Sequence, residues 1–164
     1  MVPTESATKQ PRISWDEVRR SGAACRELTL TFLGARVIIA DYNMTKGHRT
    51  VKELSAQLEG VGSGSIRLME CDLRSLDSVR RFAQAFLEQE NCLDVLICNA
   101  GIAWSPTLRT ADGFHTVIQV NYLSHFLLTT LLLETLKATR ASRIVFVTSG
   151  SHRREFSLES TQQR

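Results

Sequence analysis

The stretch LDVLICNAG, residues 93–101, joins a short apolar run to a polar turn. The continuous apolar run at 95–98 is typical of a strand that is covered on both faces. Asn99 and Gly101 then supply residue types that favour a turn. A buried strand that ends in such a turn indicates an α/β protein, in which ligands bind beyond the carboxyl ends of the strands.

The pattern of a buried strand followed by a helix recurs along the chain. Strand-like apolar runs are GARVIIA (34–40), SIRLMEC (65–71) and RIVFVTS (143–149). Apolar spacing predicts helices over 15–33, over 45–58 with Thr45 as cap, from Ser75 or Asp77 to 87, and from Thr110 or Asp112 through Asn121 to 136. This alternation predicts a doubly wound, Rossmann-like parallel sheet with helices on both faces.

The sequence predicts one domain flanked by two tails. Residues 1–18 are polar and contain prolines without any helical or strand periodicity, so we expect a loose N-terminal tail. Residues 19–150 carry the strand and helix pattern and are interpreted as a partial Rossmann-like dinucleotide-binding domain. Residues 151–164 are expected to form a C-terminal tail.

Composition argues against several classes of protein. A net charge of +3, spread along the chain, gives no strong field for nucleic acid or an anionic membrane. The most apolar stretch, 126–136, is too short to cross a bilayer, so no membrane segment is predicted. The cysteines and histidines show no metal-ligand spacing, so no metal site is predicted. The cysteines occur singly, which is typical of a reducing compartment, and we expect a cytoplasmic protein.

Polar residues at the predicted strand ends are the candidates for ligand binding. Asp41 could accept hydrogen bonds from ribose hydroxyls of a dinucleotide, or it could simply cap the next turn. Asp72 could meet an adenine edge, although an Asp before a helix is usually a cap. The tripeptide Asn99, Ala100 and Gly101 would let backbone approach a flat ligand, or it is an ordinary tight turn.

Five ordered segments resemble the short-chain dehydrogenase/reductase family, particularly its retinol-dehydrogenase-like branch. They are GARVIIADYNMTKG (34–47), CDLRSLDSVRRFAQAFL (71–87), LDVLICNAGI (93–102), DGFHTVIQVNYLSHFLLTTLLLETL (112–136) and SRIVFVTSGSH (142–152). The resemblance extends from about residue 21 to 152 and agrees best from Gly34 onward. Their order and spacing make it far more specific than a single glycine motif.

The resemblance implies roles for individual residues. Asn99, Ala100 and Gly101 match the element that lines the cofactor groove, and Asp72 matches an adenine-contacting Asp. Asn121 matches the helix Asn that holds a water of the proton relay, although a structural hydrogen bond could also explain it. Ser149 matches the catalytic Ser that binds the substrate oxygen, and is otherwise an ordinary turn residue.

The resemblance also implies a nicotinamide cofactor, NAD(P). Its 2′-phosphate form would be repelled by Asp41, and the branch commonly carries Arg at the next position, where this chain has Tyr42. We therefore expect NAD to be favoured over NADP. For His115, His125 and His152 we expect structural or solvated roles.

The family pattern contains two parts that we expect this chain to lack. A first strand with a TGxxxGxG turn would hold the pyrophosphate, and SGAAC (21–25) is at most a remnant of it. A catalytic Tyr with a Lys four residues later would lie some two dozen residues beyond Ser149. We expect this Tyr–Lys pair to be absent, with neither Tyr42 nor Tyr122 belonging to one.

The sequence thus favours an incomplete oxidoreductase of this family. Its full-length relatives would pass a hydride between NAD(P) and a small alcohol or carbonyl, such as a retinoid or other lipophilic substrate. We expect a truncated form with little activity of its own. The alternative is a non-enzymatic fragment or pseudo-enzyme that binds a partner or forms a homodimer through the helix over 110–136.

Overall fold

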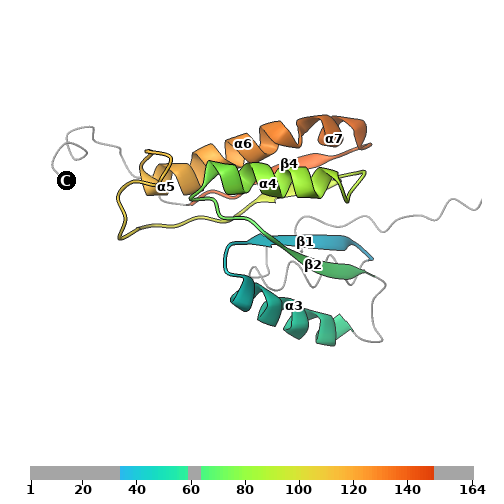
Figure 1. Ribbon diagram of the computed structural model, residues 1–164. Coiled ribbons are helices and arrows are strands. Elements are labelled where there is room, and N and C mark those ends of the chain that lie inside the picture. Colours follow the sequence, from blue (N-terminus) through green and yellow to red (C-terminus); the bar gives the residue numbers. More distant parts are fainter. Residues whose placement is uncertain (1–33, 59–63, 150–164) are drawn as a thin grey trace, which may run out of the picture. The chain divides into compact units, whose positions relative to one another are not determined.

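The computed structural model describes residues 34–58 and 64–149 (Figure 1). The chain divides between Cys71 and Asp72 into two compact units. The helix predicted over 15–33 and the two predicted tails lie outside the described residues, as does the predicted first-strand remnant.

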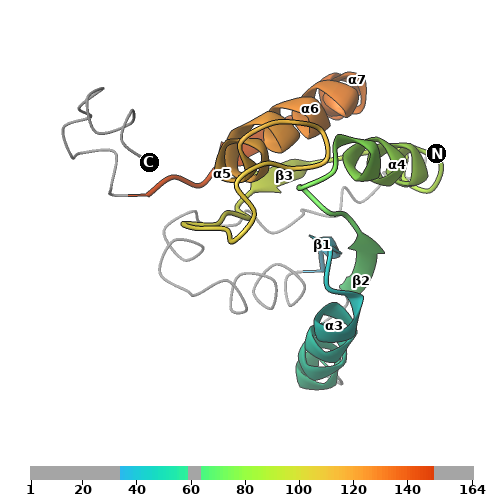
Figure 2. The same cartoon turned by 60° about the vertical axis from the view of Figure 1, so that its left-hand side comes forward.

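The first unit is a strand, a helix and a second strand. β1 (Arg36–Asp41) and β2 (Ser65–Glu70) pair in parallel from Arg36↔Ser65 to Asp41↔Glu70. α3 (Met44–Leu58) connects them and packs against both strands (Figures 1 and 2). The packing is close at Gly47, where an added Cβ would lie 2.6 Å from a Leu68 methyl carbon. A residue without a side chain therefore lets α3 approach β2.

The cap of α3 differs from the prediction. Thr45 lies inside the helix, and Asn43 caps it, because the Asn43 side-chain oxygen accepts a hydrogen bond from the Lys46 amide at 2.9 Å. The backbone of Asn43 is itself held by Asp41, whose Oδ1 accepts from the Asn43 amide at 2.8 Å. Asparagine and threonine are both good caps, so the sequence alone did not separate the two positions.

The second unit contains two parallel strands and two long helical segments. β3 (Val95–Cys98) pairs with β4 (Arg143–Phe146) from Val95↔Arg143 to Cys98↔Phe146. α4 (Leu76–Leu87) precedes β3, and Ser75 is its cap, as one of the two predicted alternatives. α4 runs beside α6 (Ser124–Leu131) in both views and packs against it (Figures 1 and 2).

The long helical segment between β3 and β4 begins later than predicted. It starts with α5 (Thr116–Ile118), passes through the π-helical turn η1 (Gln119–Leu123) into α6, and ends with α7 (Leu133–Ala138). Thr110 and Asp112 lie before it in a loop. Asp112 instead caps a different helix, since its Oδ2 accepts from the Leu76 amide at 2.9 Å. A cap contributed from 36 residues away leaves no local sequence signal.

The core lies mainly along the helices of the second unit. Its buried apolar residues are Val79, Phe82, Ala83, Phe86, Cys98, Val120, Leu128, Leu132 and Leu136, whereas those of the first unit are Leu54, Met69 and Cys71. Val37, Ile38 and Ile39 of β1 are only half-buried and Ala40 is exposed, which contradicts the prediction of a strand covered on both faces. Among residues 34–58 and 64–149, β1 and β2 pair only with each other, so each has one edge without a described neighbour.

Strands and helices alternate throughout, and the described strands form two parallel two-stranded sheets, β1–β2 and β3–β4. Each parallel pair is connected through helix, as parallel pairing requires. The α/β, Rossmann-like fold class predicted from the sequence is confirmed.

Candidate functional site

The turn after β3 lies at the carboxyl edge of the β3–β4 sheet. Its residues Asn99, Ala100 and Gly101 are exposed. The sheet pairing extends one residue past β4, because the Val147 amide donates to the Cys98 carbonyl at 3.0 Å. Ser149, which follows two residues later and is also exposed, therefore leaves the same edge of the sheet as Asn99.

Asn121 fixes this turn from the π-helical segment η1. Its Oδ1 accepts from the Ile102 amide, and its Nδ2 donates to the Ile102 carbonyl, both at 2.8 Å. Asn121 therefore makes two structural hydrogen bonds, which is the alternative role that the sequence left open for it. Isolated π-helical turns occur frequently at functional sites, because the extra residue redirects a side chain.

Gly101 allows Asn121 to come this close. A Cβ built on Gly101 would lie 3.3 Å from the Asn121 side-chain oxygen, which is tighter than ordinary contact. Any other residue would push away the atom that receives the Ile102 amide. The sequence predicts that Gly101 lets a flat ligand approach the backbone. The structure adds a second reason for a glycine, which is the close approach of the Asn121 side chain.

His125 reaches the same turn from one helical turn further along. Its side chain is 6% exposed, and its Nε2 lies 2.8 Å from the Ala100 carbonyl oxygen. Residues four apart lie on one side of a helix, so Asn121 and His125 both face the turn. The four-residue spacing of Asn121 and His125 is a sequence signal of this shared face, and the contact with Ala100 gives His125 the structural role that was one of the two predicted for it.

A buried amide, Gln119, ties the loop before the helix to the start of α4. Its Nε2 donates to Asp112 Oδ2 at 2.7 Å, and its Oε1 accepts from the Thr110 hydroxyl. Gln119 is fully buried, and Ser124 on the next turn donates to the Leu73 carbonyl at 2.6 Å. Sequence reasoning missed this network, because its members are separated by up to 51 residues.

Asp72 is engaged by an arginine two residues later. The Arg74 guanidinium donates to both carboxylate oxygens, at 3.0 Å to Oδ1 and 2.8 Å to Oδ2, and the Arg74 amide donates to Oδ1 at 2.9 Å. Partial burial alone would raise the pKa of Asp72, but these hydrogen bonds and the positive charge outweigh it and hold the pKa below its ordinary value. The carboxylate is charged at neutral pH and would have to share its oxygens with a ligand.

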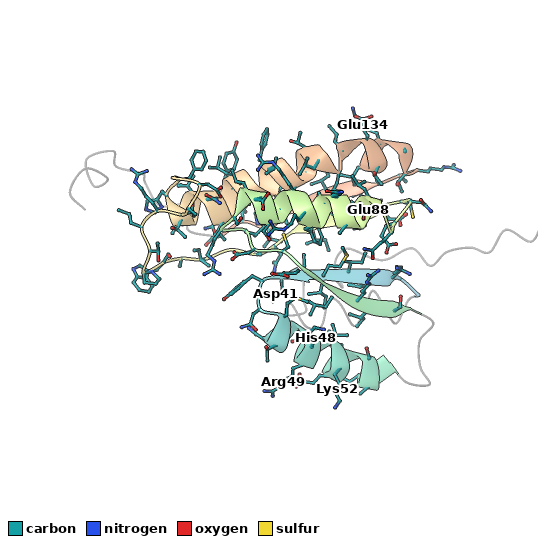
Figure 3. All side chains as sticks on the ribbon, viewed as in Figure 1. Asp41, His48, Arg49, Lys52, Glu88 and Glu134 are labelled. Atoms are coloured by element: carbon teal, nitrogen blue, oxygen red, sulfur yellow. The ribbon has the colours of Figure 1, made fainter. Side chains whose placement is uncertain are left out.

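Asp41 ends β1 in the first unit (Figure 3). Its carboxylate is half-buried and caps the turn that leads into α3 through the Asn43 amide. This is the capping role weighed for Asp41 from the sequence. One oxygen, Oδ1, makes that bond, and a ribose hydroxyl would meet Oδ2. Arg49 and Lys52 project from the side of α3 that faces away from the strands.

The thiol of Cys98, the residue directly before the turn, is buried. Burial raises the pKa of Cys98, although its contact with the Thr129 hydroxyl at 3.9 Å works in the opposite direction. A protonated thiol reacts poorly. Within residues 34–58 and 64–149, no three His, Cys, Asp or Glu side chains gather closely enough to hold a metal ion.

Comparison with models of protein families gives a match over most of the chain. The family model described as short chain dehydrogenase matches residues 23–160. The chain belongs to the short-chain dehydrogenase family. Human retinol dehydrogenase 11 is 45% identical over 119 residues, covering 73% of this chain and 36% of that protein. Human retinol dehydrogenase 14 is 45% identical over 127 residues, covering 71% of this chain and 38% of that protein.

Solved structures agree with the family assignment. RhlG of Pseudomonas aeruginosa, in its complex with NADP, matches with a TM-score of 0.65 and 28% identity over 80% of this chain and 51% of that one. This chain spans only 36% to 38% of the length of the two retinol dehydrogenases. The resemblance to this family and its retinol-dehydrogenase-like branch is therefore confirmed.

A tyrosine with a lysine four residues later does occur once in this short-chain dehydrogenase, at Tyr42 and Lys46. The prediction that no tyrosine of the chain has a lysine four residues later is therefore wrong. Tyr42 lies in the bend after β1, before the first residue of α3, so Tyr42 and Lys46 are not neighbours on one helical face. The pair also precedes Ser149, whereas the resemblance implies a pair that follows it.

The other predicted residues have simple surroundings. His115 is exposed at the start of α5 and makes no capping hydrogen bond with its side chain. His152 lies outside the described residues. Over residues 34–58 and 64–149, no helix is both long and apolar enough to cross a membrane.

Proposed function

We propose that this chain forms part of an NAD(P)-dependent oxidoreductase that transfers a hydride between the cofactor and an alcohol or carbonyl. The observation that carries the proposal is the exposed turn Asn99–Gly101 at the carboxyl edge of β3, with the backbone of the next residue, Ile102, held by Asn121. A parallel sheet binds dinucleotides at this edge. Because the similar human proteins are named retinol dehydrogenases, a retinoid or another lipophilic alcohol is the proposed substrate.

Each site residue has a proposed role in this reaction. Ser149 would donate a hydrogen bond to the substrate oxygen, and Asn121 would support the proton relay while it holds the turn. Asp41 and Asp72 would accept hydrogen bonds from the ribose and the adenine, and the backbone from Asn99 to Gly101 would line the nicotinamide side. The cofactor supplies the hydride acceptor when bound.

NAD is the proposed cofactor in preference to NADP. A carboxylate at Asp41 repels the 2′-phosphate, and the following residue, Tyr42, brings no positive charge to pair with it. Asp41 is held in a turn by its bond to the Asn43 amide, which keeps its carboxylate at the strand end.

Cofactor titration tests these statements directly. The purified chain is titrated with NADH and with NADPH, and nicotinamide fluorescence is recorded. We expect saturable binding of NADH, weaker binding of NADPH, and a reduced preference for NADH in Asp41→Asn. Asp94→Asn, which removes an exposed carboxylate at the opposite end of β3, is the matched control and should behave as wild type. Failure of both cofactors to bind would contradict the proposal.

We expect little or no turnover from these 164 residues by themselves. Neither of the two tyrosines, Tyr42 and Tyr122, follows Ser149, where the resemblance puts the catalytic tyrosine. The measurement is NADH formation with retinol or a long-chain alcohol as substrate. Measurable hydride transfer that Ser149→Ala abolishes would overturn this expectation and support the catalytic role of Ser149.

A second candidate function is homodimer formation through the long helical segment from α5 to α7, for which the sequence predicted the bounds 110–136. Ile118, Tyr122 and Phe126 recur every four residues and are exposed, by 54%, 61% and 60% of their surfaces. The rings of Tyr122 and Phe126 lie 6.3 Å apart, so they form a continuous apolar stripe. An apolar stripe of this kind on one helix is typical of an interaction surface.

Size-exclusion chromatography with light scattering tests this candidate. A homodimer should become a monomer in Phe126→Glu, because the charge would be buried at the interface. Leu108→Glu changes a residue of similar exposure outside the helix and should leave the dimer intact. A wild-type chain that is monomeric at all tested concentrations contradicts the candidate.

A reducing compartment such as the cytoplasm is the proposed location. The support comes from the thiols of Cys92 and Cys98, which are free. Free thiols persist in reducing compartments. Fractionation of cells that produce the tagged chain, with markers for membranes and secreted proteins, is the test, and recovery in the membrane fraction would contradict it.

A further inference from the structure

The imidazole of His125 is buried and satisfied on one side only. Its side chain is 6% exposed, and Nε2 lies 2.8 Å from the Ala100 carbonyl oxygen. Nδ1 is buried and has no hydrogen-bond partner within the described part of the chain. A carbonyl oxygen can only accept, so Nε2 must carry a proton to bond to Ala100, whereas Nδ1 makes no bond with the described residues.

An unsatisfied buried nitrogen has a cost that a plain apolar side chain would avoid. A phenylalanine would fill nearly the same volume without a polar atom. The position nevertheless carries a histidine, whose ring makes one polar contact with the described residues, the bond to the Ala100 carbonyl. The physical benefit of His125 over an apolar residue therefore lies in that single bond.

The bond complements the contact that Asn121 makes. Asn121 binds both backbone groups of Ile102, at the end of the turn, while His125 binds Ala100 in its middle. Asn121 alone would fix one end and leave the peptide between Ala100 and Gly101 able to rotate. A second attachment from the rigid helix α6 removes that freedom.

We propose that His125 is a positioning residue, which orients the Asn99–Gly101 turn for the nicotinamide cofactor by donating from Nε2 to the Ala100 carbonyl. The inference rests on the proposed function for the statement that this turn meets the cofactor. His125 touches neither cofactor nor substrate and acts through the backbone of the turn.

Two variants separate this role from simple filling of the core. His125→Phe keeps the ring volume and loses the donor. His125→Gln loses the ring, but its side-chain amide nitrogen reaches about as far as Nε2 and can donate to the same carbonyl. His115→Phe, at an exposed histidine, is the matched control for the substitution itself.

The first measurement is hydrogen exchange of the Ile102 amide in the intact chain without cofactor. This amide is protected by Asn121 Oδ1 and reports on the order of the turn. We expect exchange to accelerate roughly threefold to tenfold in His125→Phe, as for the loss of one hydrogen bond. His125→Gln and His115→Phe should stay near wild type. Equal exchange in His125→Phe and wild type would overturn the inference.

The second measurement is NADH titration of the same variants. A positioning role predicts an affinity loss of roughly threefold to tenfold in His125→Phe and recovery in His125→Gln. A wild-type chain that binds neither NADH nor NADPH overturns the proposed function, and the exchange of Ile102 then still decides the link between His125 and the turn. Loss of affinity in both variants alike would overturn the donor role.

The ring nitrogens give a third readout if His125→Phe does not fold. Nitrogen-15 spectra of the wild-type chain should show a proton on Nε2 of His125. A ring without a proton on Nε2 would overturn the inference, because Nε2 could not then donate to the Ala100 carbonyl.

Discussion

The two units of this short-chain dehydrogenase use the same strand–helix–strand order but hold it together differently. In the first unit, α3 packs on β1 and β2 with Leu54 and Met69 buried, and Asp41 is positioned by a bond to an amide two residues away. In the second unit, the helices bury a continuous apolar core together with polar side chains that reach distant backbone.

The difference shows how a turn at a strand end can be fixed. The local bond of Asp41 positions its own carboxylate and the amide of Asn43. It does not hold backbone that is remote in sequence. Polar side chains on the helix of the second unit instead hold backbone from outside, at Leu73, Ala100 and Ile102. The candidate cofactor turn is therefore built by the helix as much as by its own residues.

Shortening a core side chain should give the largest difference between the two units in the free energy of unfolding. Leu132 is 1% exposed among the helices of the second unit, and Leu54 is 3% exposed beside half-buried strands. We expect Leu132→Ala to lower the free energy of unfolding by about 3–5 kcal/mol and Leu54→Ala by about 2 kcal/mol, because the latter site can relax or admit water. Urea unfolding measures both. A larger loss for Leu54→Ala would break the comparison.

Removal of the buried amide should have the next largest effect. Gln119→Leu leaves Asp112 and the Thr110 hydroxyl without their bonds to Gln119, and an unsatisfied polar group costs about 1–3 kcal/mol. Gln84→Leu is the control, since Gln84 is exposed on α4 and pairs only with Glu88 along the helix. The free energies of unfolding, from urea titration, should differ clearly between the two. Similar values would show that the network contributes little.

The cap of α4 should contribute less than the buried network. Ser75 accepts from the Ser78 amide at 3.2 Å, and replacing a serine cap by alanine costs about 1 kcal/mol. Ser55→Ala, at an exposed position inside α3, removes a hydroxyl without removing a cap and should be neutral or slightly stabilising. Thermal unfolding of both variants measures the difference. No loss in Ser75→Ala would place the capping function on Asp112 alone.

The ion pair of Asp72 should give the smallest effect, and only in acid. The pKa of Asp72 is lowered in the folded chain, so its contribution to stability is present above the unfolded pKa, near 4, and is lost as the pH falls through the lower folded value. Because the pair with Arg74 is partly solvated, we expect at most about 1 kcal/mol.

Comparison of Asp72→Asn with wild type between pH 6 and about pH 2 tests the sign of this effect. The variant should be less stable at pH 6 and should lose less of its free energy of unfolding on acidification. Asp94→Asn controls for the removal of a carboxylate. A variant with the same acid dependence as wild type would contradict the lowered pKa.

Much of the fold could be predicted from the sequence. The apolar runs at β1, β2, β3 and β4 and the helical spacing of α4 were recognisable because each is a local, periodic pattern. The start of the long helix was not predicted, since Asp112 has the residue type of a local cap but binds the amide of Leu76 instead. The cap of α3 was misplaced by two residues for a similar reason, because Asn43 and Thr45 are both acceptable caps.

The candidate site was predicted in its residue types rather than in its contacts. The residue types of Asn99, Gly101 and Asn121 predict the site, and the structure brings Gly101 and Asn121 together beside Ile102. His125 and Gln119 were not assigned to the site, because neither residue type indicates by itself which groups it binds. Their roles depend on backbone carbonyls and loops that are remote in sequence.

The amino-acid sequence by itself determined the alternation of strands and helices, the family, and the residues that end each strand. These follow from short-range periodicity, turn chemistry and the order of five segments, all of which are properties of neighbouring residues. Only the tertiary structure decided that a π-helical turn presents Asn121 to Ile102 and that His125 binds Ala100. Those contacts depend on how closely α6 and its preceding turn approach the end of β3, and packing distances of that kind are set by the whole core.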